Sequence, residues 1–453
     1  MAQVTYFEIT DIVQHAMKNT HVTGIQRSVL KIIESVVRDG SRPVFGLVKH
    51  PLNTGFFIAD LSFMKRHYDL TDFVSRFDLP SGKDLWISGK LLRYRKSPLR
   101  RTFHYMRHQL RWASSAGLRA KFPRPVLPSK PSCLREAKLA RDGVIITLGA
   151  GWGTDYVALA ELAAKYDCKV ASIVYDIIPL LMPEQSAFLS RDKNQRFEKW
   201  LHFAAKNSSM LICISHFTSE TLKSYLRKNG VPAKTEVIKF PHEFMRSSEN
   251  VSSTISPGVD QIAKENYVLC VGTIEVRKNL LKLLECWQEL RNTYKSNLPK
   301  LVLAGGKGWG VDDVYQFLKA TSDVEGTVKI IDGPNDAELE LLYKNCRFTV
   351  FPSLFEGWGL PIGESLWFGK PVICANNSAM PEVGGSFATY FDHSQPNSLI
   401  EALRKMIDHP VELPKNIRTQ LRTWNDTALS LMETVEKDER PKRGLERAWA
   451  ASL

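Results

Sequence analysis

Residues 351–373 read FPSLFEGWGLPIGESLWFGKPVI, and this stretch is the most informative part of the sequence. Two carboxylates, Glu356 and Glu364, stand eight positions apart around a Gly-Trp-Gly-Leu-Pro turn, which an apolar helical pattern and a Gly-Lys-Pro stop follow. Pro361 occupies a position that a first helical turn tolerates, so we expect Glu364 near a helix N-terminus and Glu356 on the loop before it. One carboxylate can then face a sugar while the other holds a ribose. The plainer alternative is a strand, a turn and a helix with two solvated glutamates.

The wording Pro-Ser-x-x-Glu-Gly-x-Gly-Leu-Pro-x-x-Glu resembles the E-x7-E signature of retaining glycosyltransferases, especially the family 4 enzymes that use nucleotide sugars and have the GT-B fold. The resemblance implies that Glu356 contacts the donor sugar during catalysis and that Glu364 binds the donor ribose. The neighbouring residues of the motif, which are also implied as donor contacts, are Gly357, Gly359 and Leu360.

A second block, VLCVGTIEVRKNL, begins at Val268. It reads as a strand followed by a helix that starts near Asn279, a suitable N-cap residue. Arg277 and Lys278 are then expected beside a helix N-terminus, where cations, free N–H groups and the helix dipole favour a diphosphate. Two solvated surface cations are the alternative. The block resembles the family's V-G-T-x-x-x-R-K-N motif, which implies that Arg277 and Lys278 act in catalysis by holding the leaving diphosphate. The same motif adds two donor contacts, Gly272 and Thr273.

Two further segments resemble the family at predicted strand ends. After Leu301 the chain reads LVLAGG, and Gly305 is expected to let the backbone approach the donor nucleotide closely. The segment from Tyr175 to Leu180 resembles an H-D-x-x-P-L block in which Tyr175 replaces the histidine. The hydroxyl of Tyr175 can still form a hydrogen bond, and we expect Tyr175 to contact the acceptor. Asp176 is retained and is a candidate catalytic residue, and a helix-capping role is the alternative.

The segment VTGIQR, starting at Val22, stands where the family has a glycine-rich loop after its first strand. This chain has one glycine there, whereas the family has two or more. Gly24 is therefore a candidate donor contact and Arg27 a candidate acceptor contact. An ordinary loop-to-helix transition is the alternative.

Composition places the chain among ordinary globular proteins. Hydrophobic residues make up 43% and charged residues 24% of the chain, which is typical of globular proteins. The length of 453 residues suggests two or three domains. No apolar run approaches the roughly twenty residues of a transmembrane helix, and the N-terminus lacks a signal-peptide pattern. Seven scattered cysteines show no metal-binding spacing, and buried free thiols in a reducing cytoplasm are expected. The five in apolar runs are Cys168, Cys213, Cys270, Cys346 and Cys374.

The net charge of +13 is concentrated between Lys90 and Arg141, where Glu136 is the only acid. Aromatic residues interleave with cations there, a composition that favours an anionic membrane surface or a lipid-diphosphate acceptor. A solvated insertion is the second reading, and nucleic acid is not expected. The cations assigned to acceptor or membrane contact are Arg93, Arg95, Arg100 and Arg101.

Short apolar runs alternate with helical patterns along the chain, which predicts an α/β protein with parallel sheets. We expect the GT-B plan of two Rossmann-like, doubly wound domains facing a cleft. The predicted divisions are an acceptor-side domain over 1–245 with a basic insertion at about 90–141, a linker over 246–262, a nucleotide-sugar domain over 263–425 and a terminal helix or tail over 426–453.

The expected reaction is transfer of a hexose, mannose from GDP-mannose being the first choice, to a lipid-linked saccharide or surface polysaccharide with retention of configuration. Rhamnosyl, galactosyl and glucosyl transfer stay open, as does a catalytically inactive sugar-binding protein of the same fold. No pyridoxal-binding lysine context supports a phosphorylase. No metal-ligand pattern or D-x-D stretch is present, so we expect no metal and no cofactor, with cations stabilising the diphosphate instead. The expected location is the cytoplasm, peripheral on the inner face of the cell membrane.

Overall fold

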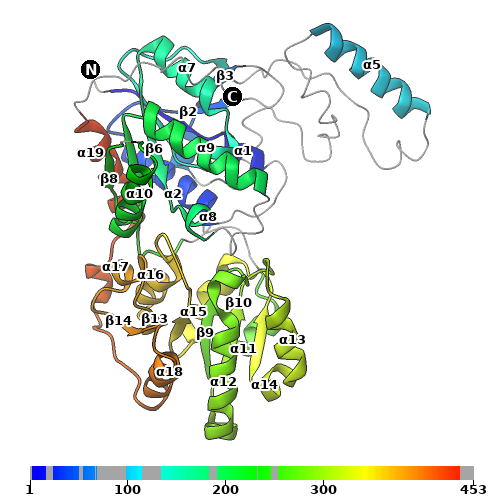
Figure 1. Cartoon of the computed structure of the whole chain (residues 1–453), viewed down its shortest axis with the longest axis vertical. Coiled ribbons are helices and arrows are strands. Elements are labelled where there is room, and N and C mark those ends of the chain that lie inside the picture. The colour runs from blue at the N-terminus through cyan, green and yellow to red at the C-terminus, as the bar shows by residue number, and fades with distance from the viewer. Residues whose placement is uncertain are drawn as a thin grey trace. The chain divides into compact units, whose positions relative to one another are not determined.

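The computed structural model describes residues 3–16, 24–49, 55–66, 68, 98–114, 134–182, 191–231, 233–245 and 254–438. They form an α/β fold with two sheets of mainly parallel strands, which confirms the predicted fold class (Figure 1). The chain divides into two compact units. The first holds the described residues up to Ile173, together with Lys199–Leu211 and those from Val435 onward; the second holds the described parts of Val174–Glu198 and Ile212–Thr434.

The eight-stranded sheet has the order β4-β3-β2-β1-β5-β6-β7-β8. Strand β1 is parallel to both β2 and β5, and β3 is antiparallel to β2 and β4. Strands β1 and β5 are buried along their whole length, as expected for parallel strands covered on both faces. The strand bounds are Thr5–Glu8 (β1), Val44–Lys49 (β2), Phe56–Asp60 (β3), Arg135–Glu136 (β4), Val144–Thr147 (β5), Lys169–Val174 (β6), Met210–Cys213 (β7) and Thr235–Val237 (β8).

The helices of this part of the chain have amphipathic patterns. In α2 the buried residues Val29, Ile32, Ile33 and Val36 recur at helical spacing and give the helix one apolar face. The helix bounds are Thr10–Ala16 (α1), Gly24–Asp39 (α2), Pro98–Ser114 (α5), Tyr156–Tyr166 (α7), Ile178–Leu181 (α8), Arg191–Asn207 (α9) and His216–Lys228 (α10).

The six-stranded sheet has the order β11-β10-β9-β12-β13-β14, and its strand pairs are parallel. The strand order reverses between β9 and β12, so the carboxyl ends of these two strands form the topological switch point at which open α/β sheets bind ligands. The bounds are Tyr267–Val271 (β9), Lys300–Ala304 (β10), Val328–Ile331 (β11), Thr349–Phe351 (β12), Val372–Ala375 (β13) and Ala388–Phe391 (β14).

Helices follow these strands in a βα pattern (Figure 1). Pro361 lies in the first turn of α16, as predicted. Helix α15 has a complete capping box in which Asn335 and Glu338 satisfy each other's backbone N–H groups. The helix bounds are Pro257–Ile262 (α11), Leu280–Tyr294 (α12), Asp312–Ala320 (α13), Ser322–Gly326 (α14), Asp336–Asn345 (α15), Leu360–Trp367 (α16), Met380–Gly384 (α17), Ser398–Asp408 (α18) and Trp424–Glu436 (α19).

Some segments differ from the predicted pattern. The last residues of the predicted basic insertion contribute β4, and Leu134 and Leu139 beside it are buried in the core. The end of the predicted linker forms α11, while residues 246–253 lie outside the described ranges. The domain bounds themselves stay a prediction. Asn279 stands at the N-cap position of α12, but its left-handed backbone (φ 55°) forms no side-chain cap, which corrects that expectation.

The expected environment of the cysteines is confirmed for the described ones, which are buried and free of disulfides. Within the described ranges, no helix combines the length and apolar character needed to cross a membrane.

Candidate functional site

The loops after β9 and β12 carry the residues that the sequence singles out. Arg277 and Lys278 lie in a short 3-10 helix, Val276–Lys278, between β9 and α12. Glu356 lies on the loop between β12 and α16. The switch point of the sheet therefore brings two cations and one carboxylate together from distant parts of the sequence. Lys278 and Glu356 are 78 positions apart.

Glu356 is the centre of this cluster. Its Oε2 lies 2.6 Å from Arg277 Nη1, and its Oε1 lies 2.6 Å from Lys278 Nζ. Ser353 Oγ also donates to Glu356 Oε1, over 2.7 Å. The side chains of all three charged residues are at most 16% exposed. The cluster is thus a largely desolvated group in which each charge has a fixed partner.

Arg277 holds the two loops together. Besides Glu356, its guanidinium donates to the backbone oxygen of Phe355 over 2.6 Å and to Glu275 Oε1 over 2.7 Å. The backbone N–H of Leu354 donates in turn to the carbonyl oxygen of Arg277. A planar guanidinium can make this many directed contacts at once, which a lysine ammonium cannot reproduce.

The protonation states follow from burial and charge together. Burial, the largest effect, raises the pKa of Glu356, but the charges and hydrogen bonds of Arg277 and Lys278 outweigh it and lower that pKa to about 2. Burial lowers the pKa of Lys278 although Glu356 opposes the shift. For Arg277, burial lowers the pKa, but Glu356 and Glu275 reverse the effect and raise it. The carboxylate and the guanidinium therefore stay charged across the physiological pH range.

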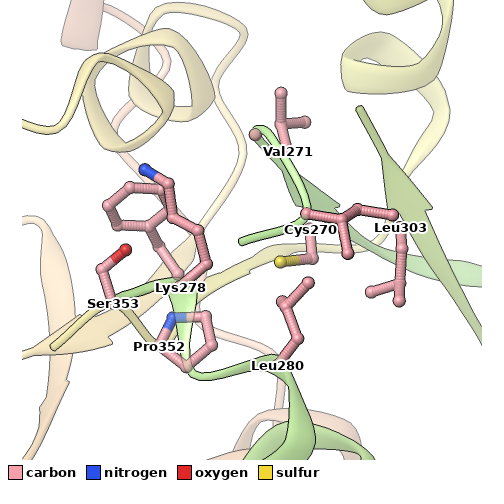
Figure 2. Close-up of a pocket in the computed structure, with 10 residues that line it drawn as sticks. Cys270, Val271, Lys278, Leu280, Leu303, Pro352 and Ser353 are labelled. Atoms are coloured by element: carbon pink, nitrogen blue, oxygen red, sulfur yellow. The ribbon is translucent and has the colours of Figure 1, made fainter. Parts of the chain in front are cut away.

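A small pocket adjoins the cluster between β9 and β12. Figure 2 shows Lys278 and Ser353 on one side of this pocket and Cys270 and Leu303 on the other. The ammonium of Lys278 lies over the ring of Phe351, 4.8 Å from the ring centroid. The aliphatic stem of Lys278 thus lines an apolar wall while its charged end reaches Glu356.

The backbone explains the glycines that follow β9 and β10, Gly272 and Gly305. Gly272 has a φ of 141°, a backbone conformation that favours glycine. A Cβ at Gly305 would stand 2.0 Å from the carbonyl oxygen of Gly272, so the adjacent loops require glycine there. The close approach predicted at Gly305 exists, and the backbone that comes close is that of Gly272. Thr273 follows as an exposed residue at the same strand end.

The Tyr175–Asp176 segment, which belongs to the same unit, contacts the loop that carries Glu356. A Cβ at Gly357 would stand 2.1 Å from the carbonyl oxygen of Tyr175, and Thr218 Oγ1 donates to that oxygen and to the carbonyl of Gly357. Asp176 Oδ1 accepts from the backbone N–H of Ile178 over 3.0 Å at the start of α8, which matches the capping alternative.

The surroundings of Asp176 nevertheless connect it to the cluster. Burial raises the pKa of Asp176, and the charges that act on it include Arg277 and Glu356. Its capping contact is therefore compatible with a role beside the cluster. Tyr175 is buried, and its ring meets Phe240 edge to face at 5.8 Å between the centroids.

Glu364 lies in α16, in the turn after the first one, and is half-buried. Its Oε2 accepts from the hydroxyl of Tyr343 over 2.8 Å. Gly359 is the N-cap of this helix with a φ of 107°, and Leu360 is its first residue. Glu364 and Glu356 thus occupy opposite ends of one loop–helix unit.

The remaining predicted residues lie elsewhere. Gly24 is the first residue of α2, and Arg27 lies in its first turn, both in the first unit. Arg93 and Arg95 lie outside the described residues, whereas Arg100 is exposed on α5, which also includes Arg101. Within the described ranges, no group of three His, Cys, Asp or Glu side chains could hold a metal ion.

Several contacts of the predicted site residues do not follow from the sequence. Ser353 stands three positions before Glu356 in the quoted motif, so the Pro-Ser wording was the available signal. Ser378 Oγ accepts from the backbone N–H of Glu356 over 3.1 Å, and Tyr343 holds Glu364. No pattern in the sequence marks Ser378 or Tyr343, because their contacts depend on how β13 and α15 pack in the fold.

Comparisons with known proteins find a family match and several relatives. Residues 253–424 match the family model described as "Glycosyl transferases group 1". O-antigen chain mannosyltransferase B of Escherichia coli is 28% identical over 232 residues, which cover 51% of this chain and 59% of that protein. The serotype-specific mannosyltransferase WbdA of Escherichia coli is 26% identical over 315 residues, which cover 65% of this chain and 37% of that protein. The matches thus span less than two thirds of the length of these relatives.

A solved structure extends the likeness to the whole fold. Sucrose-phosphate synthase from Thermosynechococcus elongatus superposes with a TM-score of 0.59 at 15% identity, covering 96% of this chain and 98% of that chain. At this identity the likeness concerns the fold alone. The chain therefore has the GT-B fold, and its residues 253–424 match the model of the glycosyl transferases group 1 family.

Proposed function

We propose that the chain transfers a hexose from a nucleoside diphosphate sugar to a saccharide acceptor, with retention of anomeric configuration. The observation that carries the proposal is the buried Arg277–Lys278–Glu356 cluster at the switch point of a group 1 glycosyltransferase domain. A ligand at the carboxyl ends of β9 and β12 would meet both cations at once.

The cations suit a departing diphosphate. Negative charge builds up on the leaving phosphate as the glycosidic bond breaks, and preorganised cations in a desolvated site stabilise that charge. A lysine ammonium has three N–H donors and arginine five, so each can bind Glu356 and a phosphate oxygen together. No metal ion is needed for this step.

The two glutamates would divide the rest of the donor. Glu356, charged and adjacent to both cations, is proposed to contact the reacting sugar. Glu364, held by Tyr343, is proposed to accept the ribose hydroxyls. The acceptor hydroxyl would then attack the oxocarbenium-like centre from the face that the diphosphate leaves. Asp176 is proposed to stand beside this centre, and we assign no enzymic nucleophile.

Mannose from GDP-mannose is the proposed donor sugar, and a lipid-linked or surface polysaccharide is the proposed acceptor. Both matched Escherichia coli relatives are named mannosyltransferases, and one is named for the O-antigen chain. Rhamnosyl, galactosyl and glucosyl transfer are the alternatives within the same chemistry.

A panel of nucleotide sugars tests the proposal. The full chain is incubated with GDP-mannose, GDP-fucose, UDP-glucose, UDP-galactose and dTDP-rhamnose, and released nucleoside diphosphate is measured. GDP release from GDP-mannose should exceed release from every other donor and should fall strongly in Glu356→Gln. A higher rate with another donor would correct the sugar. Nucleotide binding without turnover of any donor would favour the inactive sugar-binding alternative.

A further inference from the structure

Helix α5, Pro98–Ser114, carries an exposed apolar stripe that the transfer reaction does not use. Leu99, Phe103, Met106 and Leu110 are 86%, 65%, 58% and 70% exposed. Their spacing of four, three and four residues places all four on one face of the helix. Among the described residues, eight large hydrophobic side chains are exposed, and this single helix carries half of them. Such a concentration marks an interaction surface.

The charge of the same helix has one sign. Its sequence, PLRRTFHYMRHQLRWAS, contains four arginines and no acidic residue. Arg100 and Arg107 are exposed, and at 100° per residue they fall beside the apolar stripe rather than opposite to it. An apolar face flanked by cations is the pattern of a helix that lies in the plane of a membrane interface.

We propose that α5 docks the enzyme on an anionic lipid bilayer, with Leu99, Met106 and Leu110 inserted among the acyl chains and Arg100 and Arg107 at the lipid head groups. The surface was expected from the basic composition of this region; the structure adds the apolar stripe and its orientation on the helix. Docking in this way needs no spanning helix, because the helix axis lies parallel to the membrane plane.

The charge pattern favours lipid over the other candidate partners. Two copies of α5 packed stripe to stripe would bring Arg100 and Arg107 of both helices near one seam, and neither helix has an acidic residue to neutralise them. A nucleic acid would satisfy the arginines but would leave the leucines in water. An anionic bilayer satisfies both, since its head groups pair with the cations and its acyl chains cover the stripe.

Docking would bring the enzyme to the surface where lipid-linked saccharides reside. The inference does not depend on the proposed transfer reaction, because vesicle binding and donor turnover are separate measurements. A chain that binds vesicles but turns over no donor would contradict the proposed function alone. A chain that turns over a donor but ignores vesicles would contradict only the docking inference.

The test is flotation of the full-length chain with vesicles of phosphatidylcholine alone or with added phosphatidylglycerol. The stripe variant is Leu99→Gln with Met106→Gln and Leu110→Gln, and the charge variant is Arg100→Gln with Arg107→Gln. The matched control is Ile255→Gln with Val411→Gln, two exposed apolar residues elsewhere. Thermal unfolding of each variant checks that the fold is retained.

The wild type and the control should bind the anionic vesicles equally. The charge variant should bind about fivefold more weakly for each arginine removed at low salt, and the difference should shrink as salt is added. The stripe variant should bind more than about tenfold more weakly at every salt concentration, because acyl-chain contacts are not screened. Absence of wild-type binding, or equal binding of the stripe variant, would overturn the proposal. So would a wild-type dimer that the stripe variant converts to monomer with vesicle binding unchanged.

Discussion

At the scale of single residues, the loop after β12 places Glu356 between two cations that the loop after β9 supplies. The carboxylate keeps its charge because Arg277 and Lys278 offset the cost of its burial. Breaking one side of such a buried group leaves the other charges uncompensated. Substitutions here therefore change both the affinity for a ligand and the stability of the unit, and the two effects must be measured separately.

The first prediction concerns the two cations. Arg277→Ala and Lys278→Ala should each weaken nucleoside diphosphate binding by about 1.5–3 kcal/mol, because each removes a charge-assisted contact. That loss corresponds to roughly a 10- to 150-fold rise in Kd. Arg277→Lys should recover only part of the affinity, since an ammonium cannot reproduce the forked contacts to Glu356, Glu275 and Phe355.

Titration calorimetry with GDP and UDP measures these affinities. Lys282→Ala, at an exposed position of α12, is the control and should bind like the wild type. Thermal unfolding of the same samples separates lost affinity from lost fold. If Arg277→Ala and Lys278→Ala bind nucleotide as the wild type does, these residues do not form the diphosphate site.

The second prediction concerns Tyr343, which sequence reasoning did not find. Its buried hydroxyl fixes one oxygen of Glu364, and its ring stacks on Phe368 at 5.4 Å between the centroids. Glu364→Gln should weaken nucleotide binding with little effect on the rate at saturating donor. Tyr343→Phe should shift affinity in the same direction by about 0.5–1.5 kcal/mol, the net value of one hydrogen bond.

Tyr294→Phe is the matched control for Tyr343→Phe, because its hydroxyl donates to Asp408 on the exposed surface of the same unit. That variant should leave the Kd of GDP unchanged. A Glu364→Gln enzyme that binds nucleotide normally but turns over slowly would show that the assigned roles of the two glutamates are reversed.

The sequence motifs were enough to select most of the candidate site residues. Arg277, Lys278 and Glu356 form ion pairs in the structure that the sequence does not predict, and their roles at the site stay predictions. The sequence predicts which residues face a strand end, whereas the pairing depends on distances between two loops that are far apart in the chain. Tyr343 was missed for the same reason: its partner lies 21 positions away, across the packing of α15 against α16.

At the scale of secondary-structure elements, continuous apolar runs located the buried strands well. Apolar runs predict strands over Tyr267–Val271, Lys300–Ala304, Val328–Ile331 and Val372–Ala375, and β9, β10, β11 and β13 have these bounds. The antiparallel β3 and the edge strand β14 are not predicted; β14 is only partly buried and shows no apolar run. A weaker strand is predicted over Val237–Phe240, but β8 ends at Val237, and the buried Ile238 and Phe240 belong to the segment after it.

The third prediction concerns Glu8, the last residue of β1. The side chain is 1% exposed, and burial, with a smaller effect of Asp11, raises its pKa to about 7. The unfolded chain titrates near 4.5, so the folded state binds the extra proton between these two values. Its stabilising contribution is complete below about pH 4.5 and is lost as the pH rises through about 7.

Glu8→Gln stays neutral at every pH, and its amide oxygen can still accept from the backbone N–H of Thr10, as Glu8 does. Relative to the wild type, the variant should therefore gain stability between pH 5 and pH 8, by up to about 3 kcal/mol. Thermal unfolding at both pH values measures the gain. Glu401→Gln, at an exposed position of α18, is the control substitution. A stability difference between Glu8→Gln and the wild type that does not change with pH would mean that Glu8 does not titrate in this range.

At the scale of the whole molecule, the alternation of strands and helices predicts the α/β class, and the resemblance of the motifs to family 4 glycosyltransferases implies the GT-B plan. The fold comparison confirms both. The family model covers the second half of the chain, where the motifs are densest. In the first half of the chain, only short segments resemble the family's motifs. The sequence therefore predicts candidate site residues in one half but not the apolar stripe of α5, since exposure depends on what packs against a helix.

The central claim is that Glu356 acts on the reacting sugar at a diphosphate site built by Arg277 and Lys278. Its most direct test compares Glu356→Gln with the wild type in two measurements, the turnover of the best donor of the panel and the Kd of the matching nucleoside diphosphate. We expect turnover to fall by about 100-fold or more, the usual cost of losing one transition-state contact, with a change in Kd of less than about tenfold. Glu364→Gln should show the opposite pattern. Turnover of Glu356→Gln within a fewfold of the wild-type rate would mean that Glu356 does not act on the reacting sugar.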